Sequence, residues 1–208
     1  MIPVKVLAVQ YLTAVTPEMS KALGTEAPCL GLITTDSDDP TYIALDQATK
    51  DAQVTVSYGR SFYAGAGNST TPYAGEVLGI LAGPTPGAVR SGMESALSEL
   101  QRVGFEEVNG VPCLAHTVSR CGSFLAKEAG VAEGSPIAYL IAPPLESMYA
   151  MDAALKAADV KLCKLYTPPT ETNFGGGLLT GTQSACAAAC AAFRDAVEAV
   201  ARNPRNVG

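Results

Sequence analysis

Apolar positions in the first half of the chain fall into short segments with strand or helix spacing. Residues 4 to 10 alternate as a strand does, residues 29 to 35 and 76 to 83 are apolar runs typical of buried strands, and residues 54 to 58 form a further strand. Between them, helical spacing follows Thr16-Pro17, Asp39-Pro40 and Thr85-Pro86, which are typical helix starts. The predicted order is βαβαββα, with Asp39 as the cap of the second helix.

The second half repeats this plan at an offset of 106 positions. YIALDQATKDAQV (residues 42 to 54) aligns with MYAMDAALKAADV (residues 148 to 160), which pairs Asp46 with Asp152 and Lys50 with Lys156. Lys21 and Gly24 fall on Lys127 and Gly130, so a helix should end at the same place in both halves. A repeat defines the structural unit. We therefore predict two copies of one domain, residues 1–107 and 108–208.

The amino-acid composition indicates that the chain forms oligomers. Only 16% of residues are charged and 48% are hydrophobic, whereas about 25% charge is typical of a soluble domain. Part of the surface is therefore expected to be buried against other copies. The net charge of −6, without a basic run, argues against a nucleic-acid partner. Because no apolar run reaches the roughly 18 residues of a membrane span and no signal peptide is recognisable, we expect a cytoplasmic protein with no membrane partner.

Catalytic and metal-binding patterns are weak. The chain has one histidine, His116, within an apparent strand, where a structural role is the commoner one. The six cysteines include no Cys-x-x-Cys pair, and Cys186 and Cys190 follow the helical spacing of Phe193, so they indicate core positions. The run GAGNST (residues 65 to 70) lacks the Gly-Lys-Ser/Thr ending of a phosphate loop. We predict no catalytic residue, no metal and no cofactor.

Two features remain as candidate functional sites. Glycine-rich segments occupy equivalent places in the two halves, at residues 61–75 and 166–181, and loops of this length are usually functional or disordered. Asp38, in the acidic run DSDD, and Glu76 form the second feature. Asp38 near a helix start is explained by the helix dipole alone, but two converging carboxylates would also attract an ammonium group.

Long, uncommon strings carry a family resemblance over nearly the whole chain. They resemble the tandem-domain shell proteins of bacterial microcompartments, in particular those of ethanolamine utilisation, and comprise GLITTDSDDPTYIALDQATK (31–50), YGRSFYAGAGN (58–68), AGEVLGILAGPTP (74–86), AYLIAPPLESMYAMDAALKAADV (138–160), PPTETNF (168–174) and LLTGTQSACAAAC (178–190). The resemblance implies an α/β (α+β, ferredoxin-like) fold of tandem, circularly permuted microcompartment domains. It also implies a homotrimeric, pseudo-hexameric tile that packs with other microcompartment shell proteins, without catalysis.

The resemblance also implies pores for small metabolites. Asp38 and Glu76, with Phe105 beside them, match positions that bind ethanolamine in the small pores. The two glycine-rich loops match a gate over a central pore, and the gate positions are Phe62, Tyr63, Gly65, Gly67, Asn68, Tyr73, Thr172, Asn173, Phe174, Gly175 and Gly176. This chain is shorter between Gln101 and Gly110, where Phe105 lies, so the metabolite can differ from ethanolamine. The alternatives are a soluble ligand-sensing protein of the same fold that does not tile, and an enzyme acting on an amino alcohol.

Overall fold

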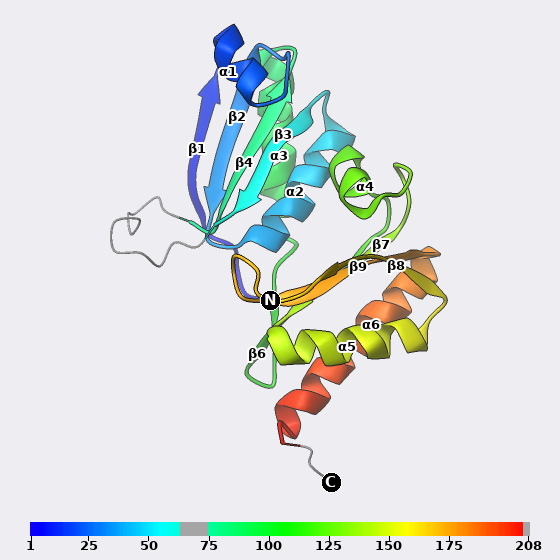
Figure 1. The fold of residues 1–208 in the computed structure, drawn as a ribbon. Helices are drawn as coiled ribbons and strands as arrows, with labels where there is room; N and C mark the ends of the chain where they lie inside the picture. Colours follow the sequence, from blue (N-terminus) through cyan, green and yellow to red (C-terminus); the bar gives the residue numbers. More distant parts are fainter. Residues whose placement is uncertain (63–74, 206–208) are drawn as a thin grey trace. The chain divides into compact units, whose positions relative to one another are not determined.

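The computed structural model describes residues 1–62 and 75–205, and its described chain follows the predicted repeat (Figure 1). The first half gives β1 (Val6–Leu12), α1 (Pro17–Ala22), β2 (Cys29–Thr35), α2 (Asp38–Asp51), β3 (Thr55–Ser61), β4 (Val77–Gly83) and α3 (Pro86–Glu99). The second gives β5 (Glu106–Val108), β6 (Val111–Val118), α4 (Ser123–Ala129), β7 (Ile137–Ala142), α5 (Pro144–Ala157), β8 (Val160–Tyr166), β9 (Gly175–Gly181) and α6 (Gln183–Arg202). The order βαβαββα is confirmed in both halves, with β5 added before the second copy.

The chain forms two compact units, each with its own sheet. One unit contains residues 3–103 and 122–125, with the strand order β1-β2-β4-β3; the other contains residues 1–2, 104–121 and 126–208, with the order β5-β6-β7-β9-β8. All pairings among the described strands are antiparallel. The units thus separate before residue 104, and the first turn of α4 packs in the first of them. The boundary between residues 107 and 108 stays a prediction.

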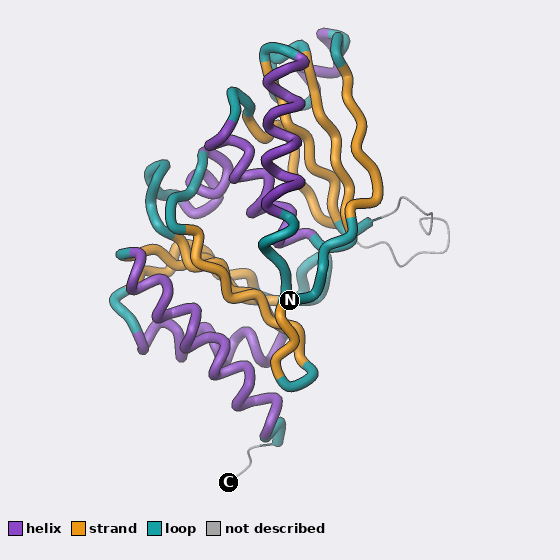
Figure 2. Tube along the Cα trace, turned by 180° about the vertical axis from the view of Figure 1, so that it is seen from behind, coloured by secondary structure: helices purple, strands orange, loops and turns teal. Residues whose placement is uncertain are grey.

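Each sheet carries a helix pair on one face (Figures 1 and 2). In the first unit, α2 and α3 close a core around Leu45, Leu81 and Met93. A separate cluster around Leu30 and Ile80 is covered by Val15, Leu23 and Ala27, which flank α1. In the second, α5 and α6 pack on the sheet around Leu140 and Phe193. Burial of these apolar side chains is the main stabilising contribution, at about 25 cal/mol per Å² of apolar surface.

Local details repeat at the offset predicted from the sequence. Gly24 and Gly130, which follow α1 and α4, have φ values of +68° and +67°, a conformation that glycine adopts without steric cost. The ladders β3–β4 and β8–β9 have bulges after Val56 and after Leu162. The two halves therefore place this glycine turn and this bulge at equivalent residues. The predicted helix end in both halves is confirmed.

One prediction about helix starts is wrong. α2 begins at Asp38 with Ser37 as its cap, so Asp39 is the second helical residue. The Asp38 carboxylate accepts the N–H of Asp39 at 2.9 Å, and Thr41 Oγ1 donates to the Ser37 carbonyl at 2.7 Å. Because these local hydrogen bonds satisfy the start of the helix, it begins two positions earlier than a cap at Asp39 predicts.

Candidate functional site

The acidic residues converge at one end of the first sheet. β2 and β4 are antiparallel neighbours with Thr35 opposite Val77, so Asp36 and Glu76 lie just beyond the same end of this pair. Glu76 N–H donates to the Thr35 carbonyl at 2.8 Å, and Asp36 Oδ1 accepts the N–H of Lys5 at 2.8 Å. Asp38 starts α2 from this end and is only 7% exposed. The structure therefore brings together the predicted acid pair.

The surroundings of Glu76 disfavour the ionised form of its carboxyl group. Partial burial, followed by the negative charges of Asp38 and Asp36, raises the pKa of Glu76 above its ordinary value of 4.5. A monovalent cation near these carboxylates would relieve the repulsion, whereas an anion would add to it. The arrangement suits a small ammonium compound.

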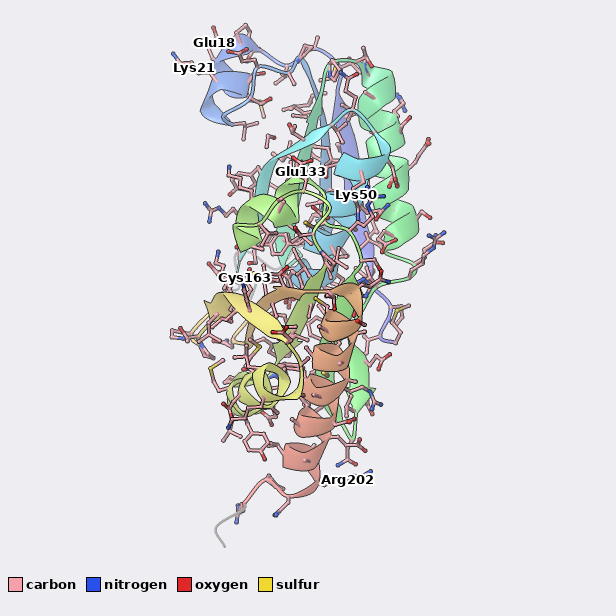
Figure 3. All side chains as sticks on the ribbon, turned by 90° about the vertical axis from the view of Figure 1, so that its right-hand side faces the viewer. Glu18, Lys21, Lys50, Glu133, Cys163 and Arg202 are labelled. Carbon is pink, nitrogen blue, oxygen red and sulfur yellow. The ribbon has the colours of Figure 1, made fainter. Side chains whose placement is uncertain are left out.

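This shift predicts a pH dependence of stability. A carboxyl whose pKa is raised on folding contributes stability that is complete below pH 4.5 and is lost as pH rises through the raised pKa. In Glu76→Gln, which lacks this titration, Tm should therefore fall less than in the wild type between pH 4 and 7. Thermal unfolding across this range measures the difference. Glu133→Gln, at an exposed turn (Figure 3), should follow the wild type.

Phe105 lies in the other compact unit. Its ring packs edge-on against Phe174 with centroids 5.6 Å apart, and its carbonyl accepts the N–H of Ile2 at 2.6 Å. Phe105 is thus in contact with Phe174, one of the predicted gate residues. Its place beside Asp38 and Glu76 stays a prediction.

The second predicted gate loop is shorter than expected. It ends at Phe174, because Gly175 and Gly176 are buried residues of β9; the expectation that residues 166–181 form one loop is wrong. Thr170 holds the loop from within, with its Oγ1 donating to the Phe174 carbonyl at 2.7 Å and its carbonyl accepting the N–H of Asn173. Thr172 and Asn173 remain in the loop as predicted. Their gating role stays a prediction.

Of the predicted gate residues in the first loop, only Phe62 belongs to the described part of the chain. Phe62 is 37% exposed and its N–H donates to the Glu76 carbonyl at 3.0 Å, which connects the start of this loop to the acid site. Tyr63, Gly65, Gly67, Asn68 and Tyr73 lie outside the described residues.

Groups with catalytic or metal-binding potential are mostly built into the core. Cys29, Cys113, Cys121, Cys186 and Cys190 are buried, as predicted for core positions, and burial raises the pKa of the Cys190 thiol to about 11. His116 is a half-buried residue of β6 opposite Tyr139. Among residues 1–62 and 75–205, no cluster of three or more His, Cys, Asp or Glu side chains is placed to hold a metal ion. None of the helices described there has the length and apolarity needed to cross a membrane.

Comparison with known proteins decides the family. The model of the BMC domain matches residues 29–112. The bacterial microcompartment shell protein EutL of Clostridium perfringens is 58% identical over 205 residues, which cover 96% of this chain and 94% of the relative. The chain belongs to the EutL family of bacterial microcompartment shell proteins. It is therefore a structural protein of a microcompartment shell in the bacterial cytoplasm.

Solved structures agree with this assignment. The ethanolamine utilisation protein EutL of Leptotrichia buccalis has a TM-score of 0.95 at 54% identity, covering 99% of this chain and 97% of that one. A trimeric shell protein, PduB, has a TM-score of 0.75 at 19% identity over 90% of this chain and 85% of its own, and shares the fold. The predicted family and the predicted α/β fold of microcompartment domains are thus confirmed.

One polar contact was missed from the sequence. Asp46 of α2 has no exposed surface, yet it accepts backbone N–H groups of Gly122 and Leu125 at 2.7 and 2.8 Å. The available signal was the presence of Asp at the same position of both halves, Asp46 and Asp152, but the lysine one helical turn further on in each half, Lys50 and Lys156, already explains such an Asp as a surface ion pair.

Proposed function

We propose that three copies of this chain form a pseudo-hexameric tile whose pores pass a small polar cation, ethanolamine or a related amino alcohol, through a microcompartment shell. The acid site at the end of β2 and β4 carries the proposal, since it brings the solvent-accessible carboxylate of Glu76 close to the charges of Asp38 and Asp36, which raise the pKa of Glu76. Support for the trimer comes from the tandem repeat, the low charge content and the resemblance in fold to a trimeric shell protein. Support for the metabolite comes from the ethanolamine utilisation proteins that the chain resembles.

In this mechanism the pore selects and does not catalyse. The ammonium group of the metabolite lowers the repulsion around Glu76 as it enters, and anionic intermediates are repelled by the same carboxylates. The loops at residues 62–73 and 168–174 would open and close a larger central pore, with the Phe105–Phe174 contact at the base of the second loop. Neither step needs a metal or a cofactor.

Calorimetry tests the acid site. Glu76→Gln removes one charge from the site and should weaken ethanolamine binding by about tenfold or more, because hydrogen bonds to charged groups contribute about 1.5–3 kcal/mol. Ethylene glycol, similar in size but without the ammonium, should bind poorly to both proteins. Glu133→Gln is the matched control with unchanged affinity. Equal affinity of the wild type and Glu76→Gln for ethanolamine would refute the assignment.

A second candidate function is a soluble sensor that binds the same ligand without tiling. The acid site alone fits both functions, so assembly separates them. Purified chain mixed with other shell proteins should form mixed sheets or closed particles visible by electron microscopy. If the chain binds ethanolamine but never enters such assemblies, the sensor is correct.

A further inference from the structure

The first two residues belong to a different compact unit from the strand that they precede. Pro3 and the residues of β1 lie in the unit of the first sheet, whereas Met1 and Ile2 belong to the unit that contains β5 to β9. The N–H of Ile2 donates to the carbonyl of Phe105 at 2.6 Å, and Figures 1 and 2 show the N-terminus beside the second sheet. We call Met1 and Ile2 the strap.

The strap also lies directly on the backbone at Gly104. A Cβ added to Gly104 would be 2.6 Å from the Ile2 carbonyl oxygen and 3.1 Å from Met1 Cγ. The first of these distances is far shorter than van der Waals contact allows, so this close approach requires glycine. The strap therefore contacts two consecutive residues, Gly104 by close packing and Phe105 by a hydrogen bond.

The main chain of the strap makes the decisive contact. Met1 and Ile2 are 61% and 45% exposed, so burial of their side chains contributes little to holding them in place. Phe105 directly precedes β5, which is the edge strand of its sheet and pairs with β6. Backbone groups at a sheet edge need a partner from another segment. The N–H of Ile2 supplies that partner for the Phe105 carbonyl.

Phe105 in turn contacts the end of the second gate loop. Its ring meets the ring of Phe174 at an interplanar angle of 76°, the edge-to-face arrangement that aromatic pairs favour. Within the loop, Thr170 accepts the N–H of Asn173 at 3.2 Å and donates its hydroxyl to the Phe174 carbonyl at 2.7 Å. Those hydrogen bonds join loop residues to one another, and the ring contact connects the loop to the segment beneath the strap.

The loop holds one residue in an uncommon backbone conformation. Asn173 has a φ of +61°, in the left-handed region that few residues other than glycine adopt, asparagine being the commonest exception. Such a conformation persists only where its surroundings hold it. Because Asn173 is next to Phe174, the conformation of the loop should depend on the ring contact with Phe105.

We propose that the strap positions the second gate loop: the main chain of Ile2 fixes Gly104 and Phe105, and the Phe105 ring fixes Phe174 at the end of the loop. This inference rests on the proposed function, because it treats residues 168–174 as a gate. Ile2 is a positioning residue that acts through Phe105. When the strap is weakened, the loop leaves the conformation seen here more often, so the strap sets how readily the gate moves.

Hydrogen exchange measured by mass spectrometry tests the strap. Ile2→Pro removes the N–H that bonds to Phe105, whereas Ile2→Ala keeps it and is the matched control. All chains carry the same N-terminal tag, so that residue 2 is preceded by the same residues in each. Peptides spanning residues 168–174 should exchange at least about threefold faster in Ile2→Pro than in the tagged wild type, since the net contribution of one hydrogen bond corresponds to roughly a threefold to tenfold change in population.

Two comparisons show whether the effect is local. Ile2→Ala should exchange in the loop as the wild type does, and peptides from β7 and α6 should keep their wild-type rates in both variants. A general loss of stability would instead speed exchange in all of these peptides together. That result, or loop exchange as fast in Ile2→Ala as in Ile2→Pro, would overturn the positioning role of the Ile2 main chain.

Gly104→Ala tests the same contact from the other side. Its Cβ would displace the strap, so loop exchange should again rise, whereas Gly87→Ala, whose Cβ would meet only Thr85 Oγ1 at 3.9 Å, should leave it unchanged. Wild-type loop exchange in both Ile2→Pro and Gly104→Ala would overturn the strap and leave the proposed function standing. If those two variants speed loop exchange but calorimetry finds no ethanolamine binding to the wild type, the strap is supported and the proposed metabolite is contradicted.

Discussion

Replacing Asp46 with alanine should lower the free energy of unfolding by about 3 kcal/mol, since an unsatisfied buried donor costs about 1–3 kcal/mol and the change leaves two. The N–H groups of Gly122 and Leu125 would lose their acceptor, and no water reaches a carboxylate position with 0% exposure. Burial, the largest contribution, raises the pKa of Asp46 above 3.8 even though the backbone donors and Lys50 oppose it. The carboxylate is thus retained for its hydrogen bonds despite the cost of desolvation.

Urea unfolding measures this loss, with Asp195→Ala as the matched control. Asp195 lies on α6 with its side chain 76% exposed and takes part in a surface ion pair with Arg194. Such pairs contribute about 0–1 kcal/mol, so the control should change little. Comparable losses in the two variants would show that Asp46 does not hold the first turn of α4.

Gly176→Ala should destabilise the protein by about 3 kcal/mol or more, or prevent its folding. The residue has φ = +144° in β9, between β7 and β8, and a Cβ there would lie 2.8 Å from the Leu140 carbonyl carbon and 3.0 Å from Ile141 Cα. Backbone strain and overpacking each cost about 1–3 kcal/mol. Neither neighbour can move aside, because both atoms belong to the backbone of β7.

Gly87→Ala provides the contrast for this substitution. Gly87 lies in the first turn of α3, where an added Cβ would meet only Thr85 Oγ1 at 3.9 Å. Alanine is the better helix former by about 1 kcal/mol, so this variant should be as stable as the wild type or more stable. Circular dichroism during urea unfolding reports both changes, and a Gly176→Ala protein with wild-type stability would contradict the close approach of β9 to β7.

The sequence was sufficient for the repeat and for most elements because their signals are local. Apolar runs and Thr-Pro pairs marked β2, β4 and α3, and the offset of 106 places α2 exactly on α5. The error over the second gate loop arose because tertiary contacts decide its structure. Gly175 and Gly176 suggested a flexible loop, but a Cβ at Gly175 would collide with Ser147 of α5 and one at Gly176 with the backbone of β7.

The candidate site was predictable in part for the same reason. Asp38 and Glu76 flank strands that are neighbours in the sheet, so their convergence follows from the topology. The contact of Asp46 with Gly122 spans 76 positions and has no local pattern. Only the fold shows that one half of the repeat contributes a segment to the other.

Sedimentation equilibrium of the purified wild type addresses the shell-tile account most directly. The duplicated fold and its low charge content predict a particle of three times the 21.4 kDa chain mass that persists on dilution to micromolar concentration. A particle with the mass of one chain, even at high concentration, would contradict it.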